Sequence, residues 1–211
     1  MTRPLAVLRP EPGNTATARR IEALGLTAIR LPLFAIRAVA WTPPDPAHYD
    51  ALLLTSANAV RHAGTGLEAV HGLPVVAVGE ATARAARAAG LTVETVGEGD
   101  AAAAIRASAG KRLLHLAGHD RVDTGVDAIT VYTAETVPVA SVAMLAGSVA
   151  LLHSARAARR LAELLQRDAV RDLRIAALSE AVRAAGPDCP GAVAGRPDDA
   201  TLVALAARLA D

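Results

Sequence analysis

The fold of this 211-residue chain is decided by the stretch Ala51-Leu-Leu-Leu-Thr-Ser-Ala-Asn-Ala-Val-Arg61, in which an apolar run meets a polar turn and then a helical pattern. A near copy starts 98 residues later (residue 149 against residue 51) and reads Val149-Ala-Leu-Leu-His-Ser-Ala-Arg-Ala-Ala-Arg159. A second pair, Val76–Thr82 and Ala176–Val182, matches at an offset of 100 (residue 176 against residue 76). Two matches at nearly one spacing predict two similar lobes.

Short apolar runs alternate with Ala/Arg/Leu helical patterns along the rest of the chain. The expected strands are Leu5–Leu8, Thr27–Leu31, Ala51–Leu54, Val75–Val78, Thr92–Val96, Leu113–Ala117, Val149–Leu152, Ile175–Leu178 and Gly191–Ala194. The expected helices are Thr15–Leu24, Ala57–Ala63, Glu80–Ala89, Ala101–Ala107, Ala155–Gln166, Glu180–Ala185 and Asp198–Leu209. This alternation is typical of parallel sheets, so we predict an α/β protein of two doubly wound parallel-sheet lobes.

Two segments interrupt the alternation and are interpreted as connectors. Leu33–Trp41 ends in a stiff proline-rich stretch, and Ile129–Val139 has strand propensity with no helix before it. A chain that crosses at one connector and returns at the other gives a discontinuous lobe, residues 1–32 and 140–211, and a continuous lobe, residues 47–127. Residues 33–46 and 128–139 are then a two-stranded linker, and we expect the site to lie in the cleft between the lobes.

Composition and charge exclude several classes of protein. The 22 basic residues almost balance the 21 acidic ones, and a net charge of +1 argues against a general nucleic-acid binder. Cys189 is the only cysteine, so no intrachain disulfide forms and a reducing compartment, the cytoplasm, is expected. The apolar run Leu5–Leu8 is too short for a signal peptide. The uncharged run Thr136–Leu152 is too short for a membrane span and is interpreted as helix, turn and buried strand.

Candidate binding groups follow the predicted strands. In open α/β sheets, ligands bind beyond the carboxyl ends of the strands, where helix N-termini favour anions. Hydroxyl, amide, glycine and arginine groups occur at most of these ends, which predicts a ligand rich in acceptors and negative charge. The alternative for each hydroxyl is that it caps a helix. The ends are Arg9–Gly13, Thr55–Asn58, Gly79–Thr82, Gly97–Asp100, Gly118–Arg121, His153–Arg156 and Ser179–Glu180.

Other familiar chemistries lack their motifs. The chain has no Gly-x-Gly-x-x-Gly, no phosphate-binding loop ending in Gly-Lys-Ser/Thr, and no Gly-x-Ser-x-Gly elbow. His115 and His119 are four residues apart, but a strand followed by Gly118 cannot present both on one helical face, so no metal site is expected. Cys189 has no obvious base beside it and is interpreted as a packed or half-exposed thiol rather than a nucleophile. Tyr132, in the return connector, could either lean into the cleft or simply pack there.

The order of these motifs resembles that of the uroporphyrinogen-III synthase family over nearly the whole chain. The residues that carry the resemblance are Leu8-Arg9-Pro10, Leu54–Val60, Val78–Ala83, Gly118 with Arg121, Val131-Tyr132, and His153-Ser154. No single motif is specific, whereas their order and spacing are.

The resemblance implies a fold of two lobes on a two-stranded linker, and an activity. Such a lyase takes hydroxymethylbilane, eliminates water and closes the macrocycle with the last pyrrole ring inverted, giving uroporphyrinogen III for haem biosynthesis without metal or organic cofactor. Tyr132 would donate a hydrogen bond to the leaving hydroxyl. The residues expected to bind the substrate carboxylates are Thr55, Ser56, Asn58, Gly79, Thr82 and Ser154, with Arg9 and Arg121 as electrostatic partners.

The sequence departs from the family pattern at two loops. Ser179 and Val182 stand where the discontinuous lobe often has a glycine and then a threonine, and the turn between Gly118 and Ile129 is short. The rival hypothesis is a non-catalytic two-lobed binding protein that closes on an anionic metabolite, since a fold does not determine a function. In either case we expect a cytoplasmic monomer that binds a small molecule and neither nucleic acid nor membrane.

Overall fold

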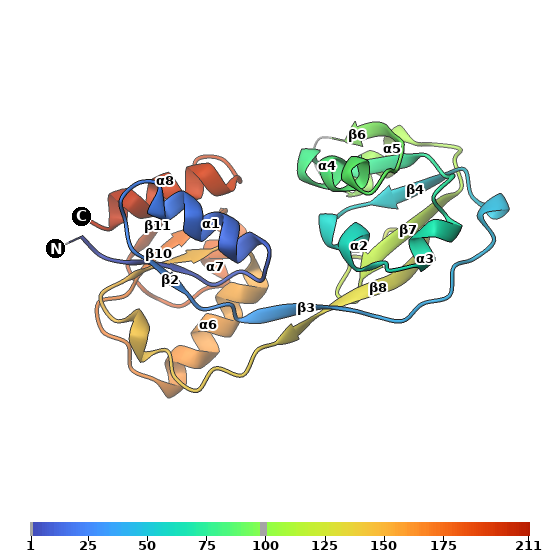
Figure 1. Ribbon diagram of the computed structural model, residues 1–211. Coiled ribbons are helices and arrows are strands. Elements are labelled where there is room, and N and C mark those ends of the chain that lie inside the picture. The colour runs from blue at the N-terminus through green and yellow to red at the C-terminus, as the bar shows by residue number, and fades with distance from the viewer. Residues whose placement is uncertain (1, 98–100) are drawn as a thin grey trace. The chain divides into compact units, whose positions relative to one another are not determined.

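Two units, each built on its own sheet, make up the chain in the computed structural model, which describes residues 2–97 and 101–211 (Figure 1). Unit 1 comprises Met1–Ala35 and Thr136–Asp211, and unit 2 comprises Ile36–Glu135. Of the predicted turn Gly97–Asp100, all but Gly97 lies outside the described residues. The sequence-based boundaries of the two lobes and of a separate linker stay predictions.

Unit 1 contains a five-stranded parallel sheet of order β11-β10-β9-β1-β2. Its strands are β1 (Leu5–Val7), β2 (Ala28–Arg30), β9 (Val149–Leu152), β10 (Arg174–Ala177) and β11 (Gly191–Val193). Its helices are α1 (Gly13–Glu22), α6 (Ala155–Arg167), α7 (Glu180–Ala184) and α8 (Asp199–Leu209).

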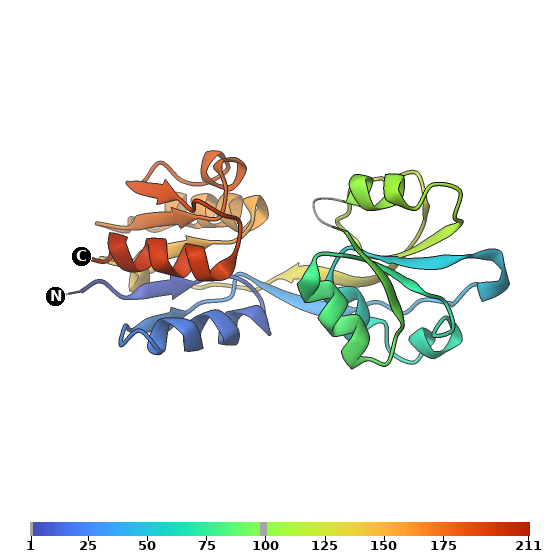
Figure 2. The ribbon, with the colours of Figure 1, turned by 90° about the horizontal axis from the view of Figure 1, so that it is seen from above.

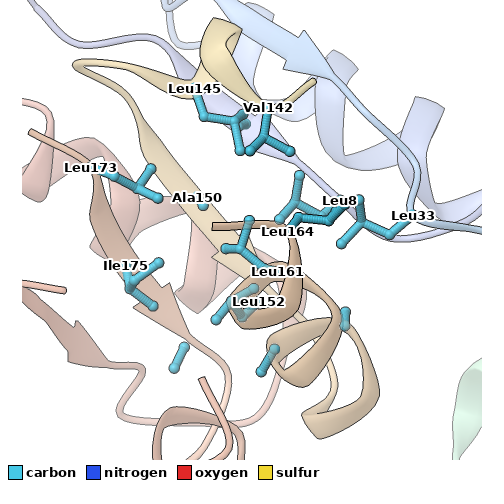
Figure 3. Packing of buried hydrophobic residues seen from close by; sticks show 14 of the residues in the cluster. Leu8, Leu33, Val142, Leu145, Ala150, Leu152, Leu161, Leu164, Leu173 and Ile175 are labelled. Carbon is cyan, nitrogen blue, oxygen red and sulfur yellow. The ribbon is translucent and has the colours of Figure 1, made fainter. Parts of the chain in front are cut away.

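Both faces of the unit 1 sheet are buried. Alternate side chains of a strand point to opposite faces, so Leu5 and Val7 pack with helices α1 and α8, which lie side by side in Figure 2. Ala150 and Leu152 of β9 point to the other face, where Figure 3 shows Leu152 beside Leu161 of α6. Strands covered on both faces are expected to be apolar throughout, as the predicted runs Leu5–Leu8, Val149–Leu152 and Ile175–Leu178 are. The edge strand β2 instead contains Arg30, which is exposed.

Unit 2 contains a six-stranded sheet of order β3-β8-β7-β4-β5-β6. Its strands are β3 (Phe34–Ala38), β4 (Ala51–Leu54), β5 (Val75–Val78), β6 (Val93–Gly97), β7 (Leu113–Gly118) and β8 (Asp127–Thr136), and its helices are α2 (Ala57–His62), α3 (Gly66–Ala69), α4 (Glu80–Ala88) and α5 (Ala101–Ala107). Helices α2 and α4 cover one face and α5 the other, so this sheet too is doubly wound.

The two sheets share one strand order and one register. The copied segments form β4 and β9 at one offset and β5 and β10 at the other, and β7-β4-β5-β6 in unit 2 corresponds to β1-β9-β10-β11 in unit 1. Leu52 pairs with Val75 in unit 2, and the residues at the two offsets, Ala150 and Ile175, pair in unit 1. The repeat seen in the sequence is therefore a repeat of strand pairing.

The predicted connectors contain β3 and β8, which are neighbours in the second sheet. The Val39 amide donates to the Val131 carbonyl at 3.0 Å, and the Val137 amide donates to the Leu33 carbonyl at 3.0 Å. Because the partner number falls as the strand number rises, this pair is antiparallel. Strand β8 is also parallel to β7, so the return connector is part of the sheet of unit 2.

Short helices account for most differences from the predicted elements. Helix α3 and the 3-10 helices Pro46–His48 and Ala143–Leu145 are each too short to show a helical period in the sequence. Within 136–152 the predicted helix is only the 3-10 turn, followed by the predicted strand β9. Among the described residues, no helix is long and apolar enough to cross a membrane.

Candidate active site

The carboxyl edge of the unit 2 sheet gathers most of the predicted site residues. Strands β4 and β7 are neighbours, and the strand order reverses between them, which is where open α/β sheets bind ligands. Thr55–Asn58 follow β4, and Gly118 ends β7 with Tyr132 of β8 in register opposite it. Gly79 and Thr82 lie at the start of α4, after the next strand.

The β4–α2 turn holds Ser56 as the N-cap of α2. Its hydroxyl oxygen accepts the Asn58 backbone N–H at 3.2 Å. Asn58 in turn accepts a hydrogen bond from Arg61 at 3.4 Å. The capping alternative therefore holds for Ser56, but a capping hydroxyl accepts through oxygen and can still donate its own proton to a ligand.

The β5–α4 turn presents backbone groups. Gly79 is the N-cap residue with φ +78°, a conformation that side chains rarely adopt, so glycine suits this turn. The first N–H groups of a helix lack intrahelical partners and favour an anion. Thr82 is only 4% exposed, so little of its side chain is accessible from this turn.

Tyr132 lies against the backbone of Gly118. A Cβ at residue 118 would come within 2.7 Å of the Tyr132 ring, so the glycine is what allows this approach. The ring is half-buried and lies 6.3 Å, centroid to centroid, from the tilted ring of His62. No side chain or backbone group in 2–97 or 101–211 hydrogen-bonds the Tyr132 hydroxyl, which leaves that O–H able to meet a ligand.

Arg121 stands on the loop after β7. Its guanidinium donates to the Thr130 hydroxyl of β8 at 2.9 Å, and the side chain is exposed. This contact holds a positive charge near the carboxyl end of the sheet.

Thr55 contacts a buried histidine that the sequence had suggested only as a rejected metal ligand. The Thr55 hydroxyl lies 3.0 Å from Nε2 of His115, which is 2% exposed in β7. Burial, with the nearby charge of Arg121, lowers the pKa of His115 to about 4. The imidazole is therefore neutral at neutral pH.

Arg9 and Ser154 lie in unit 1, at the carboxyl ends of the neighbouring strands β1 and β9. Ser154 is the N-cap of α6, and its hydroxyl accepts the Ala157 N–H at 3.2 Å. The guanidinium of Arg9 packs on Gly13, where an added Cβ would clash with it. It also lies 3.4 Å from the Asp199 carboxylate. These two site residues thus belong to a different sheet from the other seven.

Residues 15–206 match the family model described as uroporphyrinogen-III synthase HemD. The chain belongs to the uroporphyrinogen-III synthase family. This match covers most of the chain and confirms the family that the sequence motifs indicated. No curated protein sequence matches the chain.

Solved structures of uroporphyrinogen-III synthases share the fold. The enzyme from Helicobacter pylori is 15% identical with a TM-score of 0.69, and the match covers 98% of this chain and 99% of that one. A mutant enzyme from Thermus thermophilus is 18% identical with a TM-score of 0.59, covering 95% and 96%. The likeness confirms the predicted class, an α/β protein of two lobes with parallel sheets.

Family membership also confirms the predicted class of enzyme. Uroporphyrinogen-III synthases act on a small tetrapyrrole by a lyase-type cyclisation in haem biosynthesis, and nothing favours the rival non-catalytic binding protein. The roles of the individual residues stay predictions.

The sequence did not reveal a cluster of polar side chains around the Asp199 carboxylate in unit 1. Asp199, in the first turn of α8, accepts hydrogen bonds from Thr17 at 2.7 Å and from Nε2 of His153 at 2.7 Å, and it pairs with Arg9 and Arg20. Although burial opposes it, these partners lower the pKa of Asp199 to about 2. Asp199 and its partners come from four different helices or turns, so no local sequence spacing could have predicted this cluster.

Asn14 holds the turn that carries Arg9. Its side chain is fully buried, donates to the Val7 and Arg9 carbonyls at 2.8 and 3.0 Å, and accepts from Arg30 at 2.9 Å. The β1–α1 turn is thereby tied to β2. The fully satisfied amide explains why an asparagine is tolerated inside helix α1 at this point.

Asp199→Asn should destabilise unit 1 by about 2 kcal/mol at pH 7, because an ordinary carboxyl pKa near 3.8 falls to about 2 on folding. The stabilisation is present above pH 3.8 and is lost as the pH falls towards 2. Urea unfolding followed by circular dichroism measures the free energy of unfolding at each pH. The difference in this free energy between the parent and Asp199→Asn should narrow between pH 7 and pH 3. Asp188→Asn, at an exposed position of the same unit, is the matched control. A difference in the free energy of unfolding that does not change with pH would contradict this account.

Proposed function

We propose that this member of the family converts hydroxymethylbilane to uroporphyrinogen III at the carboxyl edge of the unit 2 sheet, with Tyr132 assisting departure of the hydroxyl group. The observation that carries the proposal is the Tyr132 hydroxyl, which has no hydrogen-bond partner among the described residues. Its ring is half-buried against Gly118, on the same sheet edge as the β4–α2 and β5–α4 turns. A donor with no protein partner can serve a leaving group.

The proposed binding groups suit a substrate with eight carboxylates. Thr55, Ser56 and Asn58 offer two hydroxyls and an amide after β4. Gly79 and Thr82 offer backbone N–H groups at the start of α4, and Arg121 offers a positive charge. In unit 1 the proposed contacts are Arg9 and Ser154. Hydrogen bonds from such donors to carboxylates are stronger than those between neutral partners.

The proposed chemistry asks little acid–base work of the protein. The C–O bond of the terminal hydroxymethyl group breaks as Tyr132 donates a hydrogen bond to the departing oxygen, which takes up a proton from the solvent and leaves as water. The adjacent pyrrole nitrogen stabilises the azafulvene cation that remains. The substituted carbon of the last ring attacks the cation first and gives a spiro intermediate. The bond from this carbon to its original bridging carbon then breaks, the bridging carbon bonds to the unsubstituted α-carbon of the same ring, and loss of the proton from that carbon gives the macrocycle with the ring inverted. The protein's main task is then to hold the chain so that this carbon attacks.

The test is the isomer of the product. The purified chain should convert hydroxymethylbilane to the type III isomer, whereas spontaneous closure gives type I, and chromatography of the oxidised porphyrins separates the two. Type I alone, together with saturable binding of the tetrapyrrole, would instead support the non-catalytic binding protein.

The proposal also covers the location, the oligomeric state and the cofactor requirement of the enzyme. We expect a cytoplasmic monomer that uses neither metal nor organic cofactor and binds no nucleic acid. The single cysteine and the near-neutral charge support this setting. Size-exclusion chromatography with light scattering tests the oligomeric state, and activity after exhaustive chelation tests the independence from metal.

Gly118→Ala should lower turnover about as much as loss of the Tyr132 hydroxyl does. The added methyl group would lie 2.7 Å from the ring, which must rotate or shift to relieve the contact. Gly110→Ala is a poor control because Gly110 has a positive φ, whereas Gly72→Ala meets no atom within 4 Å and should leave the rate unchanged. Parent-like turnover of Gly118→Ala would show that the position of the tyrosine ring is not critical.

A further inference from the structure

We infer that His115 is a positioning residue for the substrate: it donates its Nε2–H to the Thr55 hydroxyl oxygen and so directs the Thr55 proton towards a substrate carboxylate. The inference rests on the proposed function together with the predicted role of Thr55, whose hydroxyl is expected to bind a substrate carboxylate at the same sheet edge. It adds to that function a specific residue which touches no substrate itself.

The geometry places the two side chains on one face of the unit 2 sheet. Leu53 of β4 is in register with His115 of β7, and Thr55 lies two residues beyond Leu53, so both Thr55 and His115 point to the face that α5 covers. The Oγ1–Nε2 distance of 3.0 Å is that of a hydrogen bond. Thr55 is only half-buried, so its hydroxyl connects the buried imidazole with the sheet edge.

The other ring nitrogen determines the tautomer. Nδ1 of His115 is buried and has no hydrogen-bond partner among the described residues. If the proton were on Nδ1, a buried N–H would be left without an acceptor, which folded proteins rarely tolerate. If the proton is on Nε2, the unpaired group is a lone pair, and the Nε2–H points at the Thr55 oxygen.

The tautomer decides what Thr55 can do. A hydroxyl has one proton, and a histidine that accepted it would leave Thr55 only lone pairs to present to a carboxylate. When the His115 Nε2–H is the donor, the Thr55 hydroxyl oxygen accepts that hydrogen bond. The Thr55 proton is then available to a ligand at the sheet edge. A bound carboxylate therefore favours the Nε2–H form, because that tautomer alone lets Thr55 donate to it.

The cost of this arrangement supports a functional role. A buried nitrogen without a partner lowers stability, so a purely structural role would be better served by an apolar residue. In unit 1, the sheet register puts Val7 at the position that corresponds to His115, since Val149 pairs with Leu5 as Ala51 pairs with Leu113. An apolar side chain evidently fits this strand position in the repeat.

The test compares His115→Leu, His115→Gln, Thr55→Val and the double variant His115→Leu/Thr55→Val in the type III cyclisation assay. His115→Leu should raise KM roughly two- to ten-fold, the range of one hydrogen bond, and leave kcat close to the parent value. His115→Gln, whose amide N–H can reach the same oxygen, should recover much of the KM. In the Thr55→Val background, His115→Leu should have no further effect.

Stability and tautomer separate this role from a structural one. His115→Leu should be at least as stable as the parent at pH 7.5, and Ser108→Ala, which removes another buried hydrogen bond of unit 2, controls for general loosening. In the parent protein, ¹⁵N NMR of histidine, assigned by the signal missing from His115→Gln, should show the Nε2–H tautomer. An Nδ1–H tautomer, a parent-like KM for His115→Leu, or additive effects with Thr55→Val would each overturn the inference. A parent protein that makes no type III isomer would refute the proposed function instead.

Discussion

Tyr132→Phe should lower turnover roughly ten- to a hundred-fold, about 1.4 to 2.7 kcal/mol, while changing KM little. The hydrogen bond to the leaving oxygen strengthens as charge develops there, so its loss affects the transition state more than the bound substrate. The effect stays partial because a phenol is a weak acid near neutrality and this hydroxyl leaves readily from an electron-rich pyrrole. Single-turnover kinetics on hydroxymethylbilane measure the step directly.

The comparison with the carboxylate-binding residues sharpens this prediction. Thr55 and Ser56 changed to Ala should each act mainly through KM, since each would supply one of many contacts to the substrate. The type III isomer should still dominate in Tyr132→Phe, because ring inversion depends on how the chain is held. Tyr49→Phe, which removes the 3.3 Å contact of the other tyrosine with Asp127, serves as the control. A parent rate in Tyr132→Phe would leave Tyr132 as a packed side chain.

The apolar runs predicted the sheets well because both faces of each sheet are covered. Strands β4, β5 and β9 have the predicted bounds, since every residue of these strands must be apolar to pack between layers. The ends of helices are less well defined because capping, rather than hydrophobic period, decides them. Helices α2 and α6 begin at the predicted residues, directly after the N-caps Ser56 and Ser154. Helix α1 begins two residues before the predicted Thr15, after Pro12, which makes no side-chain capping hydrogen bond.

The contacts that support the site could not be predicted in the same way. Tyr132 meets Gly118, and Thr55 meets His115, only because β7 lies between β4 and β8 in the sheet. That order depends on a chain that leaves β6 and returns to the other side of β4, which no local pattern encodes. The same holds for Asp199, whose partners include His153 from the turn after β9 and Thr17 from α1.

The stability of unit 2 should fall by about 2 kcal/mol between pH 7.5 and pH 5 because of His115. Its pKa is about 4 when folded and 6.5 when unfolded, so below pH 6.5 the unfolded chain binds a proton that the folded chain does not. The free energy of unfolding then falls by about 1.4 kcal/mol for each unit by which the pH falls below 6.5, and the total loss approaches about 3 kcal/mol near pH 4. Above pH 6.5 the stability is unaffected.

Trp41 makes this acid sensitivity measurable in unit 2. It is the only tryptophan, it packs on the core of unit 2, and its ring N–H donates to the Ala63 carbonyl at 2.7 Å, so its fluorescence reports the unfolding of this unit. Other groups have shifted pKa values too, such as His62, whose pKa burial lowers. They contribute equally to the parent and to the variant, so they cancel when the two proteins are compared.

From pH 7.5 to pH 5, the free energy of unfolding should therefore fall by about 2 kcal/mol less in His115→Leu than in the parent, since leucine cannot bind the proton. His48→Gln, at an exposed position of the same unit, should follow the parent curve. If His115→Leu instead follows the parent curve, then His115 takes up its proton as readily in the folded chain as in the unfolded one, and its burial does not keep it neutral.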